Sequence, residues 1–429
     1  MPEQSLDVEK PKDSETTNYW TEKDTGWMFS HIGTGIGAGL LYLPINAGMG
    51  GIWPLIIVFL LSGPMVLLTH RSLTRFCLSS SFPDRDITQI VHEHFGDRVG
   101  YWLMFVCFMS MFPVLLLYSV GITNVSISFM VNQLHFDEPS RALVVFVLVV
   151  GMMTLFCGGE KYLLRLISVL VFPLTVVLMG VALYLIPQWK MDFLYHVVSW
   201  RQGLEAVFLT FPVMVFSFYH APVCSSFARS YQSKSQDIHS CIRKTDKIHF
   251  RSSIILLGIT LFFVFSCIMA MTPEQLLQAK EDNLPTLSVL ANQPGNIFFS
   301  TLAPIIAFIA ILTSFFGFFI GTIEVMNGLL TLQAKKFKPG FVTSVGSVHK
   351  ISLLILALFC WIAGVGNWSV LVILEVVVAP MMAILLFFLP VIALYKVALL
   401  KSYRNKYVDV FVFMMGILVM TGFVITQFL

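Results

Sequence analysis

Residues 33–39 read GTGIGAG, which places four glycines among seven residues in the middle of an apolar segment. No Asp, Glu, Lys or Arg occurs between residues 25 and 70. A helix that crosses about 30 Å of hydrocarbon needs roughly 20 apolar residues. The segment is long enough for two crossings. It therefore predicts two membrane-spanning helices, the first of which contains the glycine run.

Long uncharged segments recur along the rest of the chain. Of its 429 residues, 57% are apolar and 12% are charged, whereas about a quarter of the residues of soluble domains are charged. The composition excludes a soluble protein and predicts an all-α integral membrane protein with eleven spans. These lie roughly at residues 26–47, 52–76, 99–130, 141–157, 163–186, 204–228, 252–272, 299–331, 351–366, 369–395 and 408–428.

The positions of Lys and Arg predict the orientation of these spans. With the N-terminus inside, 23 of the 27 basic residues fall in cytoplasmic segments and four fall outside. An excess of positive charge on the inside is what sets topology. The C-terminus is then periplasmic. Residues 1–24 are polar and contain acids, so we expect a cytoplasmic tail and not a cleaved signal peptide.

Two polar segments between spans predict short helices. Residues 79–97 have an amphipathic pattern that is typical of a helix lying on the inner surface. Residues 272–295 contain two helix starts, at Thr272-Pro273 and at Asn283-Leu284-Pro285. This outer segment is either a lid or a packed surface hairpin.

A second interrupted span contains SFYHAP at residues 217–222. Pro222 lacks a backbone donor and clashes one turn back, so we expect the helix to break there. Unpaired backbone at membrane depth is tolerated only where protein or a water-filled cavity satisfies it. The two breaks fall in spans one and six, which are equivalent if the chain is built from two repeats of five. Paired breaks of this kind indicate the binding site of a transporter.

These patterns predict a five-plus-five inverted repeat with broken helices 1 and 6 and one extra C-terminal helix. The expected divisions are a tail at 1–24, a transporter core at 25–395 and helix 11 at 396–429. Within the core, the two repeats lie at about 26–186 and 204–395.

The glycine run is the first candidate for substrate contact. Free amides at the start of a helix attract anions, so those near Gly37–Gly39 suit a carboxylate. Carbonyls near Gly33–Gly35 suit an ammonium group. Tight helix packing through small residues is the alternative. The candidates here are Thr34, Gly35, Gly37, Ala38 and Gly39.

Polar and aromatic residues in spans three and six are the second set of candidates. His220 is interpreted as the only histidine well inside a span, where it either contacts substrate, handles a proton or plays a structural role. Phe216, Ser217 and Tyr219 beside it are expected to line the pocket. Tyr118 either closes over the substrate or makes an interhelical hydrogen bond.

Candidates for ion coupling lie in spans eight and ten. The Thr313-Ser314 hydroxyl pair suits a sodium ion, unless both hydroxyls bond back to the preceding turn. Glu324 and Glu375 are flanked by apolar sequence, and each either carries a proton, forms a gate or touches interfacial water. No cysteine or histidine spacing predicts a metal or cofactor site, and no constellation of residues indicates an enzyme.

These segments together resemble the bacterial hydroxy and aromatic amino acid permease family, and in particular its proton-coupled serine and threonine permeases. The resemblance spans the whole chain and implies a fold of the amino acid–polyamine–organocation superfamily. The motifs that carry it are GTGIGAG at 33–39, LPINAG at 43–48, HR at 70–71, LTRF at 73–76, DIT at 86–88, HFG at 94–96, YSVGITN at 118–124, PVMVFSF at 212–218 and FFVFSC at 262–267.

Departures from the serine permease pattern affect the substrate and the ion. That pattern has Asn and Ser at the positions of Tyr219 and Ala221, and Lys at the positions of Thr313 and Arg165. It has His-Tyr where this chain has Phe318-Phe319. Arg165 stays charged at cellular pH, so it can replace a bound sodium but cannot release a proton.

The prediction is therefore a bacterial inner-membrane symporter that imports a small neutral amino acid of the serine or threonine type with a proton. Alternatives are an aromatic substrate or sodium coupling. The expected partners are the amino acid substrate and the lipid bilayer, and no nucleic acid is expected.

Overall fold

The computed structural model describes residues 19–83, 85–157, 160–195, 198–232, 237–293, 297–337 and 345–426. Most of the predicted N-terminal tail lies outside these residues. The described residues are helical, without strands. The helices are α1 (Glu22–Gly35), α2 (Ala38–Met49), α3 (Ile52–Leu78), α4 (Ile87–Phe95), α5 (Asp97–Asn132), α6 (Arg141–Cys157), α7 (Glu160–Tyr184), α8 (Asp192–Tyr195), α9 (Trp200–Ser217), α10 (Ala221–Tyr231), α11 (Ile238–Ala270), α12 (Pro273–Glu281), α13 (Thr286–Ala291), α14 (Ile297–Phe337), α15 (Val345–Gly366), α16 (Val370–Ile373), α17 (Ala379–Ala383), α18 (Leu389–Lys396) and α19 (Lys406–Thr426).

The prediction of a multi-pass helical membrane protein is confirmed. Among the described residues, nine helices are long and apolar enough to cross a membrane, or ten with the bent pair α1 and α2. Each predicted span coincides with one of these or with α6. Because α6 has 17 residues and is shorter than a typical span, the count of eleven stays a prediction.

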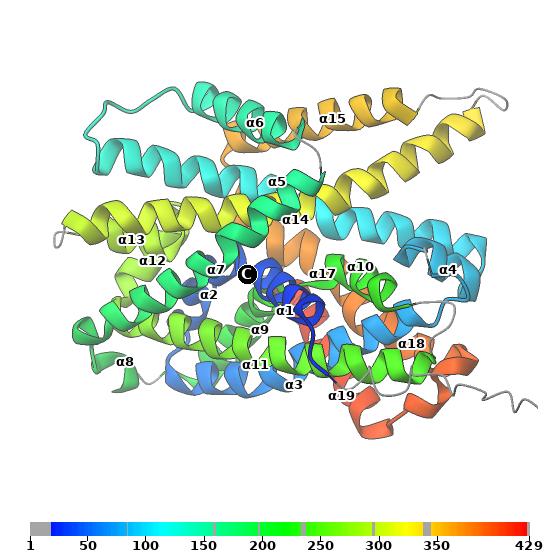
Figure 1. The fold of residues 1–429 in the computed structure, drawn as a ribbon. Helices are drawn as coiled ribbons and strands as arrows, with labels where there is room; N and C mark the ends of the chain where they lie inside the picture. Colours follow the sequence, from blue (N-terminus) through cyan, green and yellow to red (C-terminus); the bar gives the residue numbers. More distant parts are fainter. Residues whose placement is uncertain are drawn as a thin grey trace, which may run out of the picture.

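The helices form two groups that pack against each other (Figure 1). One group contains α5, α6, α14 and α15, and α14 runs along α5. The other contains α3 and α11 around the two interrupted spans α1–α2 and α9–α10. The interrupted spans are thus enclosed between intact helices, which is the position that a binding site in the membrane interior requires.

The short helices between spans are also confirmed. Asp86 begins α4 and Thr272 begins α12, and each makes a reciprocal capping box with the residue three positions on. The second outer helix, α13, starts after Pro285. Sequence alone placed these helices well because capping is a local interaction.

Both predicted breaks are present. In the first span, Ile36 and Gly37 leave the helix, and α1 meets α2 at 49°. In the sixth, residues 218–220 leave the helix between α9 and α10. The last predicted span of the core contains two π-helical turns, Leu374–Val378 and Ile384–Phe388, which the sequence did not indicate.

Candidate functional site

The first break lies against α14. A Cβ atom on Gly37 would lie 2.1 Å from Ser314 Oγ and 3.5 Å from the Tyr118 hydroxyl. The Ser314 hydroxyl donates a hydrogen bond to the Ile36 carbonyl oxygen at 3.3 Å. Tyr118 and Ser314 therefore both reach the break, and only glycine leaves room for them at position 37.

The two interrupted spans touch each other directly. A Cβ atom on Gly39 would lie 2.7 Å from Ser217 Cα and 2.9 Å from Phe216 Cδ1. Gly39 is thus a point of close backbone approach between α2 and α9. The small-residue packing that was the alternative role of the glycine run operates at this position.

The backbone of the second break is largely satisfied within the protein. The Phe218 and Tyr219 amides donate to the Val215 and Phe216 carbonyls at 3.2 and 3.1 Å. The His220 amide donates to the Nε2 atom of His70 at 3.2 Å. The second break therefore leaves little of its backbone for a ligand to bind.

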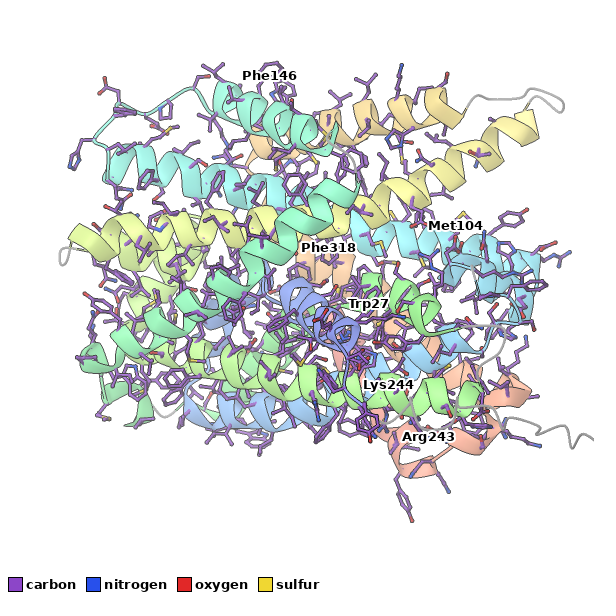
Figure 2. All side chains as sticks on the ribbon, viewed as in Figure 1. Trp27, Met104, Phe146, Arg243, Lys244 and Phe318 are labelled. Carbon is purple, nitrogen blue, oxygen red and sulfur yellow. The ribbon has the colours of Figure 1, made fainter. Side chains whose placement is uncertain are left out.

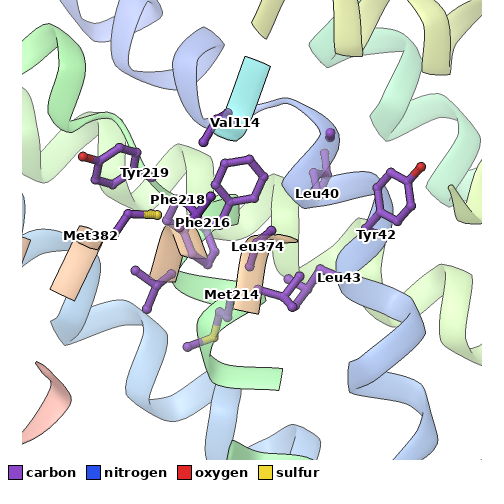
Figure 3. Close-up of a cluster of buried hydrophobic side chains, with 14 of the residues drawn as sticks. Leu40, Tyr42, Leu43, Val114, Met214, Phe216, Phe218, Tyr219, Leu374 and Met382 are labelled. Carbon is purple, nitrogen blue, oxygen red and sulfur yellow. The ribbon is translucent and has the colours of Figure 1, made fainter. Parts of the chain in front are cut away.

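Aromatic rings fill the space beside the breaks (Figure 3). The centroids of Tyr118 and Phe216 lie 6.1 Å apart, and each of these rings packs on Phe318, at 5.7 and 6.2 Å. Tyr219 packs on Phe318 at 6.0 Å from the other side. All four side chains are buried, and Phe318 lies near the centre of the molecule (Figure 2). This aromatic cluster brings together the predicted residues Tyr118, Phe216 and Tyr219.

A cavity of about 1470 Å³ leads to the first break between α1, α7, α10, α14 and α15. Four predicted site residues line it: Thr34, Thr313, Ser314 and Glu324. The other predicted residues whose side chains are described are buried and lie off the described cavity wall. They are Gly35, Gly37, Ala38, Gly39, Tyr118, Phe216, Ser217, Tyr219, His220 and Glu375.

The hydroxyls of the cavity wall differ in what they bond. Thr34 donates to the Ser30 carbonyl at 2.8 Å, and Thr313 donates to the Ile309 and Ala310 carbonyls at 3.0 and 3.1 Å. Both therefore bond back to their own helices. Ser314, in contrast to Thr313, bonds to the first break, at the Ile36 carbonyl. Arg165 lies on α7, with its side chain outside the described part of the chain.

Glu375 is held inside the bundle by a residue that sequence reasoning missed. The Asn46 amide donates to Glu375 Oε1 at 2.7 Å, and the carboxylate residue is 5% exposed. Asn46 lies in α2 among apolar residues. A polar amide in such a span was the signal that could have indicated a buried polar partner. The pair joins the interrupted first span to the tenth.

The outer hairpin α12–α13 closes over the breaks. The Asn283 carbonyl accepts hydrogen bonds from the Tyr42 hydroxyl at 3.2 Å and the Asn124 amide at 2.8 Å. The Thr286 hydroxyl donates to the Leu41 carbonyl at 2.5 Å. This hairpin packs directly on the first span and on α5, so the cavity lies on the opposite side of the breaks.

His220 is not the only buried histidine of the described residues. His31, His70 and His249 are equally buried, and their rings lie beside that of His220. His31 and His70 lie toward the ends of their predicted spans and His249 lies before the span at 252–272, so position along the chain did not indicate that the fold would bring them together.

The sequence is similar to those of known permeases and transporters. The profile described as the tryptophan/tyrosine permease family matches residues 26–360. The serine transporter SdaC of Escherichia coli strain K12 is 41% identical over 419 residues, which are 96% of each chain. The threonine/serine transporter TdcC of Escherichia fergusonii is 35% identical over 432 residues, with 96% of this chain and 97% of the relative covered.

Among solved structures, a manganese transporter of Eremococcus coleocola matches with a TM-score of 0.65 at 14% identity, covering 98% of this chain and 89% of that one. A mutant of the same transporter matches with a TM-score of 0.62 at 14% identity, covering 94% and 85%. At this identity the likeness concerns the fold. The sequence matches extend over nearly the full length of both relatives, and the chain belongs to the tryptophan/tyrosine permease family of membrane transporters.

Proposed function

We propose that the chain imports serine, threonine or a similarly small neutral amino acid across the bacterial inner membrane by alternating access, driven by a proton. The observation that carries this proposal is the cavity that ends at the first break, beside Ile36, Gly37 and Ser314. The names of the two relatives support the choice of substrate.

The orientation follows from charge. Lys23, Arg229 and Lys350 line the cavity, and all three belong to segments that the distribution of basic residues predicts to be cytoplasmic. The N-terminus is then cytoplasmic and the C-terminus periplasmic. In this orientation the α12–α13 hairpin closes the periplasmic side, so the structure corresponds to an inward-open state.

The substrate backbone is expected to dock at the first break. The start of α2 offers amides for the carboxylate, and the Ile36 carbonyl offers an acceptor for the ammonium group. The rings of Tyr118, Phe216 and Phe318 pack within 6.2 Å of one another beside this position. All three rings are buried and packed on one another, which supports serine or threonine over the aromatic alternative.

Proton coupling is supported by two carboxylates in the apolar spans. The Thr313 and Ser314 hydroxyls donate to protein carbonyls, and their oxygens keep lone pairs that can bind a sodium ion. Glu375, buried with Asn46, and Glu324, on the cavity wall, are the candidate proton carriers. Sodium remains the alternative ion.

The test is uptake of labelled amino acids into liposomes, with proton and sodium gradients imposed separately. We expect serine and threonine to accumulate under an inward proton gradient and excess tryptophan to compete poorly. Accumulation driven by a sodium gradient alone would show that sodium, and not a proton, is the coupled ion. Absence of counterflow for all twenty amino acids would overturn the proposed transport function.

A further inference from the structure

Four histidines lie together in the helix group that contains the breaks. His31 is on α1, His70 on α3, His220 at the second break and His249 on α11, and none of them is exposed. The His31 ring stacks on that of His249 at 4.6 Å and lies 4.9 Å from that of His220, measured between centroids. Burying an imidazole inside a membrane bundle is costly without a partner, so the arrangement requires a physical explanation.

Three of these rings share one pattern. Each has one nitrogen within hydrogen-bond distance of a protein oxygen, whereas its other nitrogen is buried without a hydrogen-bond partner. The free atoms are Nε2 of His31, Nε2 of His220 and Nδ1 of His249. The bonded pairs are His31 Nδ1 with Ser252 Oγ at 3.4 Å, His220 Nδ1 with the Phe218 carbonyl at 2.9 Å, and His249 Nε2 with Thr74 Oγ1 at 2.7 Å.

The bonded partners fix where the protons are. A carbonyl only accepts, so His220 carries its proton on Nδ1 and presents a lone pair at Nε2. The Ser252 hydroxyl donates to the Ile248 carbonyl at 3.0 Å, so its oxygen accepts from His31 and leaves Nε2 of that ring bare. The Thr74 oxygen can accept from His249 in the same way. This is how metal-binding histidines are held, with the second nitrogen bonded to a protein oxygen.

The three rings also converge. One ring nitrogen from each of His31, His220 and His249 lies within 4.8 Å of those from the other two. We propose that these three histidines form a binding site for a divalent transition metal of the Zn²⁺ or Co²⁺ type, with a water molecule as the fourth ligand. Imidazole suits these ions, whereas Mg²⁺ and Ca²⁺ prefer oxygen ligands. In a tetrahedral complex, nitrogens that each lie about 2.1 Å from the ion are about 3.4 Å apart, so the rings must move closer together on binding.

His70 has a different position in this cluster. Its Nδ1 atom lies 2.9 Å from the Val66 carbonyl and its Nε2 accepts from the His220 amide, so neither nitrogen is free. It is a positioning residue for His220. The cavity wall contains Ser30 and Pro222, which are close in sequence to two of the ligands. A bound ion would join α1, the second break and α11.

The site can be tested on the full chain, purified through a tag without histidine and stripped with a chelator. Titration with Co²⁺ is expected to give one ion per chain with the visible absorption of a four-coordinate complex, which Zn²⁺ then abolishes by displacement. X-ray absorption of the Zn²⁺ form should show three imidazole nitrogens at about 2.0 Å. This measurement uses the unaltered protein, so it does not depend on whether any variant folds.

The variants His31→Ala and His249→Ala should each weaken Zn²⁺ binding by about 10-fold or more, since loss of an outer partner alone has an effect of that size. His135→Gln, in the exposed loop after α5, is the matched control and should bind like the wild type. Size-exclusion chromatography checks that each variant is folded. Wild-type protein that binds no more Co²⁺ than the double variant His31→Ala/His249→Ala, or Zn²⁺ with only oxygen ligands, would overturn the site.

Discussion

Ser314 on α14 donates a hydrogen bond at 3.3 Å to the carbonyl oxygen of Ile36, the residue at which the first span leaves its helix. This bond satisfies a carbonyl that has lost its place in a helix and links the two groups of helices. Thr313, its neighbour, bonds only to its own helix. The two hydroxyls therefore have separable roles.

Replacing Ser314 with alanine is expected to lower the initial rate of serine uptake by about 5-fold, since a hydrogen bond of this kind contributes about 1 kcal/mol. Thr313→Ala is the matched control, and its uptake should stay within about 2-fold of the wild type. Both rates are measured in the same liposomes, with protein amounts normalised. Equal losses in the two variants would contradict the distinct role of Ser314.

Gly39→Ala is expected to destabilise the protein by about 1–3 kcal/mol and to impair uptake. The added carbon would lie 2.7 Å from the Ser217 Cα atom, and backbone cannot yield as a flexible side chain does. At Gly258 on α11, nothing lies within 4 Å of the added carbon. Gly258→Ala should therefore leave the thermal unfolding midpoint in detergent unchanged or slightly raised, and a similar fall in both variants would argue against close packing as the cause.

How far sequence predicts this molecule depends on the range of the interaction concerned. The breaks at Gly37 and His220 and the caps at Asp86 and Thr272 follow from the local chemistry of glycine, proline and capping residues. The hydrogen bond from Asn46 to Glu375 joins residues that are 329 positions apart in the chain. Within the histidine cluster, the bond between His220 and His70 joins residues that are 150 positions apart. No spacing along the chain indicates such contacts, because the folded bundle creates them.

Asn283 is expected to hold the outer side closed. Its carbonyl accepts from Tyr42 and Asn124, while its side chain donates to the Trp368 carbonyl at 2.9 Å and accepts from the Val370 amide at 3.0 Å. Asn283→Ala removes the side-chain bonds, each worth about 1–3 kcal/mol when a buried partner is left unpaired.

The variant should shift the protein toward an outward-open state and slow uptake. The readout is alkylation of a single cysteine placed at Leu43 in a cysteine-free background, which we expect to become faster. Glu281→Ala, at the exposed end of α12, is the control. Unchanged alkylation in Asn283→Ala would count against this closure.

Glu375 is predicted to carry the coupled proton. Glu375→Gln keeps an oxygen that accepts from Asn46 but has no titratable group. We expect this variant to retain serine counterflow at near the wild-type rate and to lose at least about 10-fold of its accumulation under a proton gradient, an effect of about 1.4 kcal/mol. Glu324→Gln tests the other candidate carrier, on the cavity wall, and should preserve both activities if Glu375 carries the proton. Normal accumulation in Glu375→Gln would remove Glu375 from the coupling mechanism.

Glu93 on α4 gives a prediction for pH. Partial burial by itself raises the pKa of Glu93, but hydrogen bonds from the Ser81 amide and the Ser80 hydroxyl lower that pKa to about 2. The unfolded value is about 4.3, so the ionised carboxylate stabilises the fold above that pH, and the contribution is lost as pH falls toward 2. At pH 7, Glu93→Gln should destabilise the protein by about 1 kcal/mol. This value is lower than the full pKa shift implies, because solvent screens the charge of a partly exposed carboxylate. The difference in thermal midpoint between wild type and variant should shrink from pH 7 to pH 3, whereas a constant difference would show that charge on Glu93 plays no part.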